Sequence, residues 1–380
     1  MKRNVLCKIL LVCCAAALFA GCAAAGGAET RKDAATPGAA TERPETPRPA
    51  TAVPESTPAE ACAFGAWVPY WDYENALADL DTLEDRLAYA VCFAAIFDAQ
   101  DQLLLLPDAQ KTLALMLARR AGAAAIYLSV VNDIEVEAYV YDNKSPALLW
   151  RLLGTDEALS GHIEDLMELL RSSGADGLEI DYEAIRSDTA LWQRFALFIE
   201  RLYARTEAEG YPLRVVLSWD AAKQASFPEG PQYSVMCYNL YGTHSGPGPK
   251  ADRDFLRQVF DANRALPGEP VLAFATGGFD WSADGSATAL SLAGAEALRS
   301  ERGVTESGVQ RDGESAALTF TYFDAAGLTH TVWYADETTL LFWRSLALEA
   351  GYTGFDLFLL DGNAAALSAF FTPPNALDPD

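Results

Sequence analysis

The sequence predicts an α/β fold, a (β/α)8 TIM barrel with a small α+β insertion between strands seven and eight. From residue 61 onward, eight apolar runs of strand length alternate with segments of helical period. The runs are nearly continuous in Val, Ile, Leu, Phe and Tyr, which is typical of parallel strands buried on both faces. One stretch, 282–334, breaks the alternation. A doubly wound open sheet would give a similar pattern and is the structural alternative.

The barrel elements follow in order along a single domain, 61–380, in which we find no internal repeat. The predicted strands are Phe64–Trp71, Leu87–Phe97, Ala123–Val131, Gly177–Glu183, Leu213–Trp219, Tyr233–Tyr241, Pro270–Thr276 and Gly354–Leu360. The predicted helices are Asp108–Ala121, Thr155–Ser173, Asp188–Glu209, Asp252–Ala265 and Thr338–Ala350. The helix that opens at Thr155 has the clearest boundaries, because Thr155-Asp156-Glu157 can cap its start and Gly174 follows its end.

The insertion, about 282–334, is expected to carry a β-hairpin. Leu318–Phe323 alternates apolar and polar residues, a turn follows, and His330–Tyr334 supplies the second strand. For Trp281 and Trp333 we favour packing in a core over lining a cleft. Insertions at the C-terminal rim of such a barrel often wall the active site, so this one is a candidate wall.

The N-terminus has the pattern of an export signal, residues 1–22. Met1-Lys2-Arg3 is basic, Ile9–Ala20 is apolar and too short to cross a bilayer, and small residues precede Cys22. This arrangement resembles a bacterial lipobox, which implies that Cys22 is lipidated; an ordinary signal peptide with an incidental Cys is the alternative. Residues 23–60 have no aromatic residue and are rich in Pro, Ala and Thr, which indicates a disordered tether. We therefore expect an extracytoplasmic protein, lipid-anchored to a bacterial membrane.

Composition limits the partners. The chain has 28 Lys+Arg against 53 Asp+Glu, a formal net charge of −25, so we expect no nucleic-acid partner. Outside the first 22 residues, no apolar run approaches the ~20 residues of a membrane span. Of the seven cysteines, Cys62, Cys92 and Cys237 lie in the barrel sequence without metal-ligand spacing. We expect them to be buried free thiols, with one disulfide pair as the alternative, and we expect a monomer.

The strongest chemical signal lies in Asp176–Glu183, which reads Asp-Gly-Leu-Glu-Ile-Asp-Tyr-Glu. Alternate side chains of a strand share a face, so Glu179, Asp181 and Glu183 should point into the barrel and the aliphatic residues toward the helices. Like charges so close cannot all ionise comfortably, and one acid should keep its proton, as a general acid must. The alternatives are an exposed acidic edge strand and a divalent-metal site, for which no partner motif appears.

These residues resemble the signature of glycoside hydrolase family 18, Asp-Gly-x-Asp-x-Asp-x-Glu. Asp176, Gly177, Asp181 and Glu183 match it, and Glu179 stands where the family usually has Asp. Further resemblances to the family occur at Cys92–Asp98, Met236–Asn239, Tyr241–Gly242, Gly246–Pro249 and Gly278–Trp281. Thr321–Asp324 through Gly327 and His330–Trp333 resemble the insertion hairpin of the spore-cortex-lytic branch.

The resemblance implies a substrate-assisted, retaining mechanism. Glu183 would be the general acid and base, and the substrate's own acetamido oxygen would attack the anomeric carbon. Asp181 would hydrogen-bond the acetamido N–H and stabilise the developing positive charge. Glu179 would share a proton with Asp181, and Tyr238 would orient the acetamido carbonyl. Asp176 and Asn239 would contribute to substrate binding.

Two departures from the family pattern bear on activity. Glu179 is one methylene longer than Asp, and Phe358 stands where the family usually has the Trp that floors the −1 sugar site. Softer candidates for substrate contact are Tyr70 and Trp71 after strand one, and His244 after strand six. His162 is expected on a helix surface, and His330 in the hairpin.

We therefore expect a hydrolase of β-linked N-acetylglucosamine-containing glycans, such as chitin, N-glycan cores or peptidoglycan. No serine-hydrolase, zinc-protease, dinucleotide or P-loop motif is present, so we expect no cofactor and no metal. One alternative is a catalytically impaired glycan-binding lipoprotein on the same barrel. A two-lobed solute-binding lipoprotein is the other.

Overall fold

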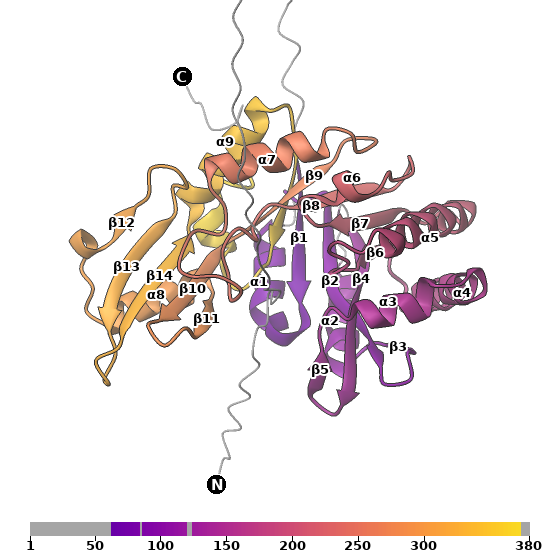
Figure 1. The fold of residues 1–380 in the computed structure, drawn as a ribbon, viewed down its shortest axis with the longest axis horizontal. Coiled ribbons are helices and arrows are strands. Elements are labelled where there is room, and N and C mark those ends of the chain that lie inside the picture. The colour runs from indigo at the N-terminus through magenta and orange to yellow at the C-terminus, as the bar shows by residue number, and fades with distance from the viewer. Residues whose placement is uncertain (1–61, 84–85, 120–123, 374–380) are drawn as a thin grey trace, which may run out of the picture. The chain divides into compact units, whose positions relative to one another are not determined.

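A closed barrel of eight parallel strands forms the centre of the molecule. The computed structural model describes residues 62–83, 86–119 and 124–373. The strands β1 and β2 are followed around the barrel by β4, β6, β7, β8, β9 and β15, and β15 pairs back with β1. Their bounds are β1 Ala63–Pro69, β2 Tyr89–Asp98, β4 Ala125–Glu137, β6 Gly177–Asp181, β7 Leu213–Leu217, β8 Gln232–Met236, β9 Val271–Ala275 and β15 Gly354–Phe358 (Figure 1). This closure confirms the predicted barrel and excludes both the open sheet and the two-lobed binding protein.

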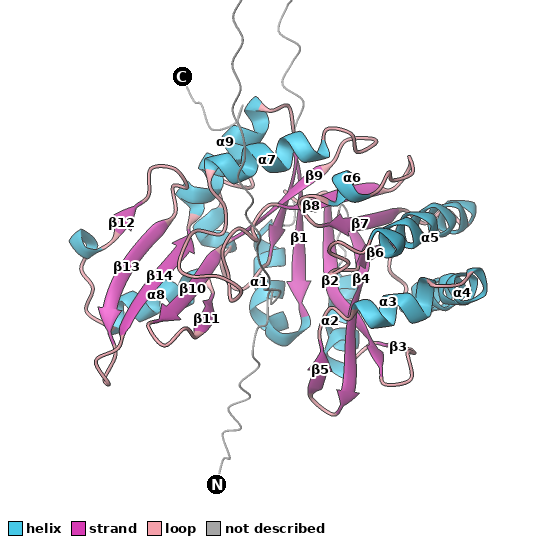
Figure 2. Cartoon of the chain, viewed as in Figure 1, coloured by secondary structure: helices cyan, strands magenta, loops and turns pink. Residues whose placement is uncertain are grey.

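Helices cover the outside of the barrel (Figure 2). They are α1 Tyr73–Leu83, α2 Pro107–Arg119, α3 Pro146–Leu153, α4 Asp156–Ser173, α5 Thr189–Ala208, α6 Ala221–Gln224, α7 Arg253–Asn263 and α9 Glu337–Glu349. The capping pattern at α4 is as expected, since Thr155 Oγ1 accepts the N–H of Ala158 and Gly174 ends the helix at φ 74°. α1, α3 and the short α6 were not predicted from the sequence.

The core lies between the strands and these helices, and it corrects one prediction. His162 is buried on the inner side of α4, where its Nε2 lies 2.7 Å from the hydroxyl of Tyr182. Its ring also stacks on Phe198 of α5, with centroids 5.4 Å apart. His162 is three residues from Leu159 and one from Ile163, so it lies on the apolar stripe of the helix, and the predicted surface position is wrong.

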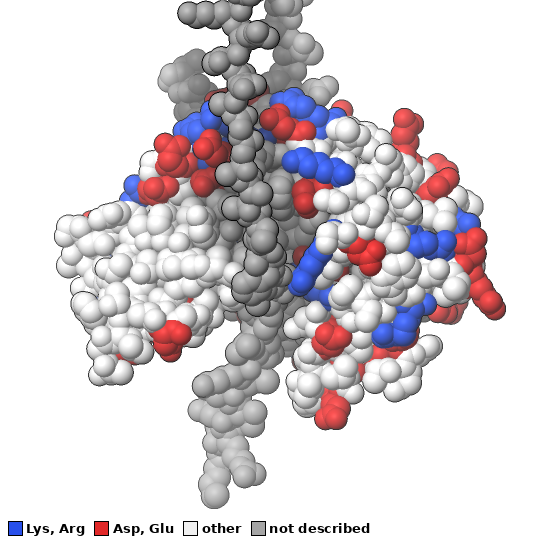
Figure 3. All heavy atoms as spheres, viewed as in Figure 1, with Lys and Arg blue, Asp and Glu red and all other residues white. Residues whose placement is uncertain are grey.

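The insertion between β9 and β15 is a second, antiparallel sheet with one helix of its own. Its strands pair in the order β11-β10-β14-β13-β12. The bounds are β10 Gly277–Ser282, β11 Ala287–Leu290, α8 Leu292–Glu301, β12 Gln310–Arg311, β13 Leu318–Phe323 and β14 Thr329–Ala335. The predicted hairpin is β13–β14, Trp281 is buried, and Trp333 is half-buried. Figure 3 shows few charged side chains on the face of this sheet turned to the viewer.

The insertion begins earlier than the expected residue 282. The chain leaves β9 and enters β10 at Gly277, whose φ is 62°. A Cβ there would lie 2.2 Å from the carbonyl oxygen of Leu290, so only glycine fits this turn. No loop separates the two strands, which is why the sequence pattern did not reveal the boundary.

Shorter elements extend the C-terminal rim of the barrel. β3 Leu103–Leu104 pairs with the end of β2, and β5 Val140–Asp142 pairs with the end of β4 (Figure 1). The 3-10 turns are η1 Tyr70–Asp72, η2 Glu306–Gly308 and η3 Ala364–Leu367. The chain that follows the β4–β5 hairpin reaches the candidate site, because Lys144 comes two residues after β5.

The described part of the chain contains three cysteines, none of them in a disulfide. Cys92 and Cys237 are buried, Cys62 is half-buried, and all three are free thiols. Among the described residues, no helix combines the length and the apolar character needed to cross a bilayer. The predicted signal 1–22, the lipidation site Cys22 and the tether 23–60 lie outside the described residues.

Candidate active site

Strand β6 carries acidic residues on its inner face and apolar residues on its outer face. Leu178 and Ile180 are fully buried in the core shared with the helices. Glu179 reaches across the barrel interior to Trp67 of β1 and Arg214 of β7. Asp181, two residues on, shares the inward side of the strand with Glu179 and is 7% exposed. The predicted inward orientation of this row of acids agrees with these contacts.

Below the barrel mouth, Glu179 belongs to a closed polar layer. One of its oxygens accepts the indole N–H of Trp67 at 2.7 Å, and the other accepts Nε–H of Arg214 at 3.0 Å. Arg214 also donates from Nη2 to Asp356 at 2.7 Å, and Asp356 accepts the hydroxyl of Tyr89 at 2.6 Å. The Arg214 guanidinium stacks over the Tyr89 ring, 3.9 Å from its centroid. These residues are buried, and the single guanidinium of Arg214 faces two carboxylates, those of Glu179 and Asp356.

This layer bears on the role expected for Glu179. Burial raises the pKa of Glu179, and the positive charge of Arg214 opposes that shift. Both carboxylate oxygens of Glu179 are already engaged by Trp67 and Arg214. Glu179 is thus held by an arginine in this structure, and the proton sharing with Asp181 that the resemblance implies stays a prediction. The sequence analysis missed Arg214, although one cation inside the apolar run Leu213–Leu217 was a visible signal.

Asp181 has the opposite environment. Its Oδ1 is buried and has no hydrogen-bond partner. Burial raises the pKa of Asp181 well above its ordinary value, and the nearby charge of Glu183 adds to the shift. The predicted protonated acid of the cluster is thus best assigned to Asp181 in this structure.

Glu183 lies just past the end of β6, and its backbone is fixed by β4. The side-chain amide of Asn132 accepts the Glu183 N–H at 2.8 Å and donates to the Glu183 carbonyl at 3.1 Å. The Glu183 carboxylate forms an ion pair with Lys144, whose Nζ lies 2.5 Å from Oε1. Ala184 and Arg186 follow in left-handed conformations, with φ of 62° and 54°. Asn132 and Lys144 lie 51 and 39 positions away from Glu183 in sequence, and no motif pointed to them.

Two cavities open at this end of the barrel. The first, here called the acid pocket, has a volume of about 300 Å³ and is lined by Lys144, Tyr182, Glu183, Ala184, Ile185, Arg186, Trp192, Val216, Leu217, Ser218, Asp220 and His244. The second, the aromatic pocket, has a volume of about 370 Å³ and is lined by Trp71, Asp72, Tyr238, Asn239, Lys250, Thr276, Gly278, Phe279, Ala289, Leu290, Ser291, Phe358, Leu359 and Asp361. The predicted site residues therefore divide, with Glu183 and His244 in one pocket and Trp71, Tyr238, Asn239 and Phe358 in the other.

The aromatic pocket has a flat apolar floor. Phe358 stacks on Tyr238 with centroids 5.6 Å apart and planes 14° apart, and Trp67 and Phe93 meet it edge-on, each at 5.7 Å. Rings that present a face to a cavity suit the apolar face of a sugar. Residues of the insertion, among them Phe279 and Leu290, line the same pocket, as expected of a wall.

Asp361 of the aromatic pocket is a polar residue that the sequence analysis missed. Burial raises its pKa to about 7, with further contributions from Asp79 and Asp72. Its buried Oδ1 has no hydrogen-bond partner. A carboxyl group in this position can bond the hydroxyl of a bound sugar.

Two predicted substrate contacts lie elsewhere. Asp176 precedes β6 at its N-terminal end, and its Oδ2 accepts the N–H of Ile126 at the start of β4. This position is opposite the rim that carries Glu183, so Asp176 secures the strand start, and the expected substrate contact has no geometric support. Tyr70 packs edge-on against Trp71, 5.2 Å between centroids. Burial raises the pKa of Tyr70 to about 12, and Tyr141 and Asp133 of the β4–β5 region add to it, so Tyr70 faces that hairpin.

His244 lines the acid pocket, and its Nδ1 is buried without a partner. Within the described ranges, no cluster of three or more His, Cys, Asp or Glu residues has the arrangement of a metal site. The side chains that line the two cavities offer carboxyl groups, the ammonium groups of Lys144 and Lys250, one guanidinium, one imidazole and aromatic rings.

Comparison with known proteins agrees with the fold. No family model matches the chain. A Bacillus subtilis protein, YdhD, named provisionally as a sporulation-specific glycosylase, is 23% identical over 209 residues, which is 52% of this chain and 49% of that protein. The match thus spans about half the length of this curated relative.

Two solved structures resemble most of the chain. The spore cortex-lytic enzyme SleL of Bacillus cereus has a TM-score of 0.66 at 18% identity, over 82% of this chain and 75% of that one. A chitinase of Chromobacterium violaceum has a TM-score of 0.67 at 21% identity, over 82% of this chain and 99% of that one. The resemblance read from the sequence is confirmed at the level of the fold.

Proposed function

We propose that this protein is a glycoside hydrolase of family 18 type that cleaves β-linked N-acetylglucosamine-containing glycans. The observation that carries the proposal is the pair of acids at the barrel mouth. Asp181 is buried with a raised pKa, and Glu183 is fixed by Asn132 at the edge of a cavity. The similarity to a chitinase and to a cortex-lytic enzyme supports the same reaction class.

The arrangement suits a substrate-assisted reaction. A sugar on the floor of Phe358 and Tyr238 would bring its acetamido group toward Asp181. Glu183 would protonate the glycosidic oxygen while the acetamido oxygen attacks the anomeric carbon and forms an oxazolinium ion. Asp181, ionised once its proton has passed to Glu183, would accept the acetamido N–H and stabilise the positive charge. Glu183, now ionised, would take a proton from the water that opens the ring and complete a retaining hydrolysis.

The test is Glu183→Gln, assayed on a chitin-type oligomer and on an N-acetylglucosamine aryl glycoside. We expect kcat to fall by about 10²–10⁴-fold, because a positioned general acid and base contributes about that much. Glu168→Gln, an exposed residue on α4, is the matched control and should retain full activity. Unchanged turnover in the Glu183 variant would refute the acid assignment.

The second candidate is a glycan-binding protein that no longer catalyses. The ion pair between Lys144 and Glu183 favours it, since a general acid must carry a proton that this pair excludes. It predicts oligosaccharide binding by calorimetry with no released product at high protein concentration. Detection of a β-configured product by proton NMR would eliminate this candidate.

Placement outside the cytoplasm remains part of the proposal. Lipidation of Cys22 would hold the domain at a membrane through residues 23–60. Cys22→Ser should move the protein from the membrane fraction to the soluble fraction of cells that express the full chain, and labelling with a fatty-acid analogue should disappear.

A further inference from the structure

We infer that the acid pocket is a leaving-group subsite for an acidic amino sugar, whose carboxylate draws Lys144 away from Glu183. The inference rests on the function proposed above and names its substrate class. The positions of the two pockets assign one sugar to each. The sugar that is attacked needs Tyr238 and Phe358, which lie in the aromatic pocket. Glu183 donates to the glycosidic oxygen, so the acid pocket, which Glu183 lines, takes the sugar that leaves.

The acid pocket gathers basic groups in an acidic protein. The chain carries a net charge of −25, yet Lys144, Arg186 and His244 line this one cavity. The guanidinium of Arg186 is exposed and makes no hydrogen bond or ion pair with the described part of the chain. The other acid in the pocket, Asp220, faces Ser218 and Gln224, which donate to its two oxygens at 3.3 and 3.5 Å. Arginine and lysine together suit a carboxylate ligand.

Hydrogen bonds fix the backbone of both basic residues of this pocket. Asp133 accepts the backbone N–H of Lys144 at 2.7 Å, which sets the lysine at φ 55°. The indole N–H of Trp192 donates to the carbonyl of Arg186 at 2.7 Å. Both basic residues are therefore held in left-handed backbone conformations by buried or half-buried neighbours, as is common at binding sites.

The ion pair between Lys144 and Glu183 prevents general-acid catalysis unless the substrate draws Lys144 away. An ion pair with Lys144 requires an ionised Glu183, whereas the general acid must be protonated. A neutral leaving sugar gives the lysine no new partner. A carboxylate on that sugar does, because Lys144 can exchange one carboxylate for another at little cost. Asp181 can then pass the proton that it holds to Glu183, which leaves Asp181 ionised and lets Glu183 protonate the glycosidic oxygen.

The experiment compares three substrates that share one β-1,4-linked N-acetylglucosamine unit. Their leaving sugars are N-acetylglucosamine, its 3-O-lactyl ether with a free carboxylate, and the methyl ester of that ether. The ester keeps the size of the lactyl group and removes its charge. We expect the wild-type kcat/KM for the acid to exceed that for the ester by at least tenfold.

The variants locate the effect. In Lys144→Met the ratio of kcat/KM for the acid to kcat/KM for the ester should fall to near one. Turnover of the two neutral substrates should rise several-fold, because Glu183 no longer has Lys144 as its partner. Arg186→Met should lower the ratio through KM with little change in kcat. Lys111→Met, on α2 and exposed, should leave the ratio unchanged. Binding of the acid and the ester to Glu183→Gln by calorimetry gives a second readout, which does not depend on folding of the Lys144 variant.

Each outcome decides between the claims. Equal cleavage of the acid and the ester, or an unchanged ratio in Lys144→Met, would overturn this inference and leave the hydrolase intact. No cleavage of any of the three substrates would reject the hydrolase itself, and the subsite with it.

Discussion

Two positions on the inner face of one strand, Glu179 and Asp181, have opposite electrostatic environments. Glu179 is fully paired, with Trp67 on one oxygen and Arg214 on the other. Asp181, closer to the mouth, has a buried oxygen without a partner and a pKa raised by burial and by Glu183. The residues are two apart, and the strand geometry treats them alike.

The difference teaches that depth in the barrel separates structural from reactive acids. In the Arg214 layer the guanidinium holds two buried carboxylates, whereas Asp181 keeps a buried oxygen without a partner, two residues before the Glu183 that lines the acid pocket. An unmatched buried carboxyl is costly to the fold and useful to a reaction. Variants that unpair the first acid or neutralise the second should therefore move stability in opposite directions.

The largest effect is expected at the closed layer. Arg214→Met leaves the buried carboxylates of Glu179 and Asp356 without their cation, which should lower the free energy of unfolding by about 3–5 kcal/mol at neutral pH. The orphaned carboxyls would have raised folded-state pKa values, so the loss should be complete at high pH and shrink as the pH falls through those values. Urea unfolding at several pH values measures both.

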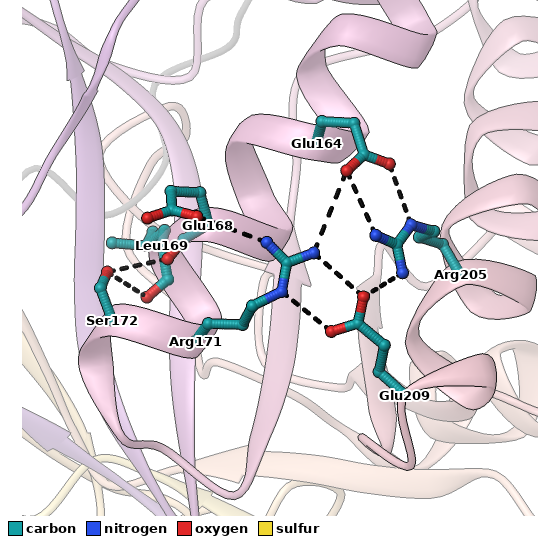
Figure 4. A network of polar contacts seen from close by, with 7 residues as sticks. All are labelled: Glu164, Glu168, Leu169, Arg171, Ser172, Arg205 and Glu209. Carbon is teal, nitrogen blue, oxygen red and sulfur yellow. Dashed lines mark hydrogen bonds and ion pairs between the residues drawn. The ribbon is translucent and has the colours of Figure 1, made fainter.

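An exposed arginine is the matched control. Arg171 contacts Glu164, Glu168 and Glu209 in the network between α4 and α5 (Figure 4). Its partners are exposed or half-buried and stay solvated without it, so Arg171→Met should change the stability little. Similar losses in the two arginine variants would show that burial does not set the value of the pair, and the comparison would fail.

The next effect is expected at the mouth. Asp181→Asn should lower kcat by about 10²–10³-fold, because the amide cannot stabilise a developing positive charge. The same variant should be more stable at pH 7, since the folded state holds a proton on Asp181 that the unfolded chain releases. The stability that wild type gains as the pH falls from 7 toward 4 should be absent in the variant.

Asp165→Asn on the exposed side of α4 controls for the loss of one negative charge. It should change neither the activity nor the pH profile. If Asp181→Asn destabilised the protein at pH 7, Asp181 would be ionised and paired in the fold, contrary to the unmatched environment described here.

Much of this fold could be predicted from the sequence because strands buried on both faces are nearly continuous runs of apolar residues. All eight barrel strands were predicted, and each observed strand lies within three residues of its prediction at the start; β4 alone runs well beyond its predicted end, to Glu137. β4 continues as an exposed hairpin on the rim, and its apolar residues Val136 and Val140 lie in no core. α3 and α6 were missed because they are short, eight and four residues, although α3 buries Leu148, Leu149, Leu152 and Leu153 in the core.

The site could be predicted only where its residues are neighbours in sequence. Glu179, Asp181 and Glu183 form a local pattern, and β geometry places them on one face. Their partners Arg214 and Lys144 come from other strands and loops, and the barrel register that brings them together is not visible in one sequence. His162 could have been placed correctly, since its spacing from Leu159 and Ile163 is that of a buried stripe.

A third test concerns His162, a buried titratable group that packs against the outer side of β6 and has no charged partner there. His162 is buried against Tyr182, and burial lowers its pKa to about 3. The unfolded chain takes up a proton near pH 6.5 and the folded chain does not, so stability should fall as the pH drops below 6.5, by about 1.4 kcal/mol per pH unit. His162→Gln keeps a polar group for Tyr182 and should remove this slope.

Measuring the free energy of unfolding of both proteins between pH 7 and pH 4.5 isolates the histidine, because the carboxyl groups contribute equally to each. Parallel pH dependences in the two proteins would mean that His162 is accessible to protons in the fold.

The smallest effect is expected at the apolar floor, where no charge is at stake. Phe358→Leu keeps an apolar side chain beside Tyr238 but removes the flat face, which should raise KM several-fold, about 1 kcal/mol, with kcat almost unchanged. Phe323→Leu, at a ring that is 71% exposed, is the control and should have no effect. A fall in kcat at constant KM would instead mean that Phe358 acts by positioning Tyr238, and the floor would then belong with the acids of the mouth rather than with passive sugar binding.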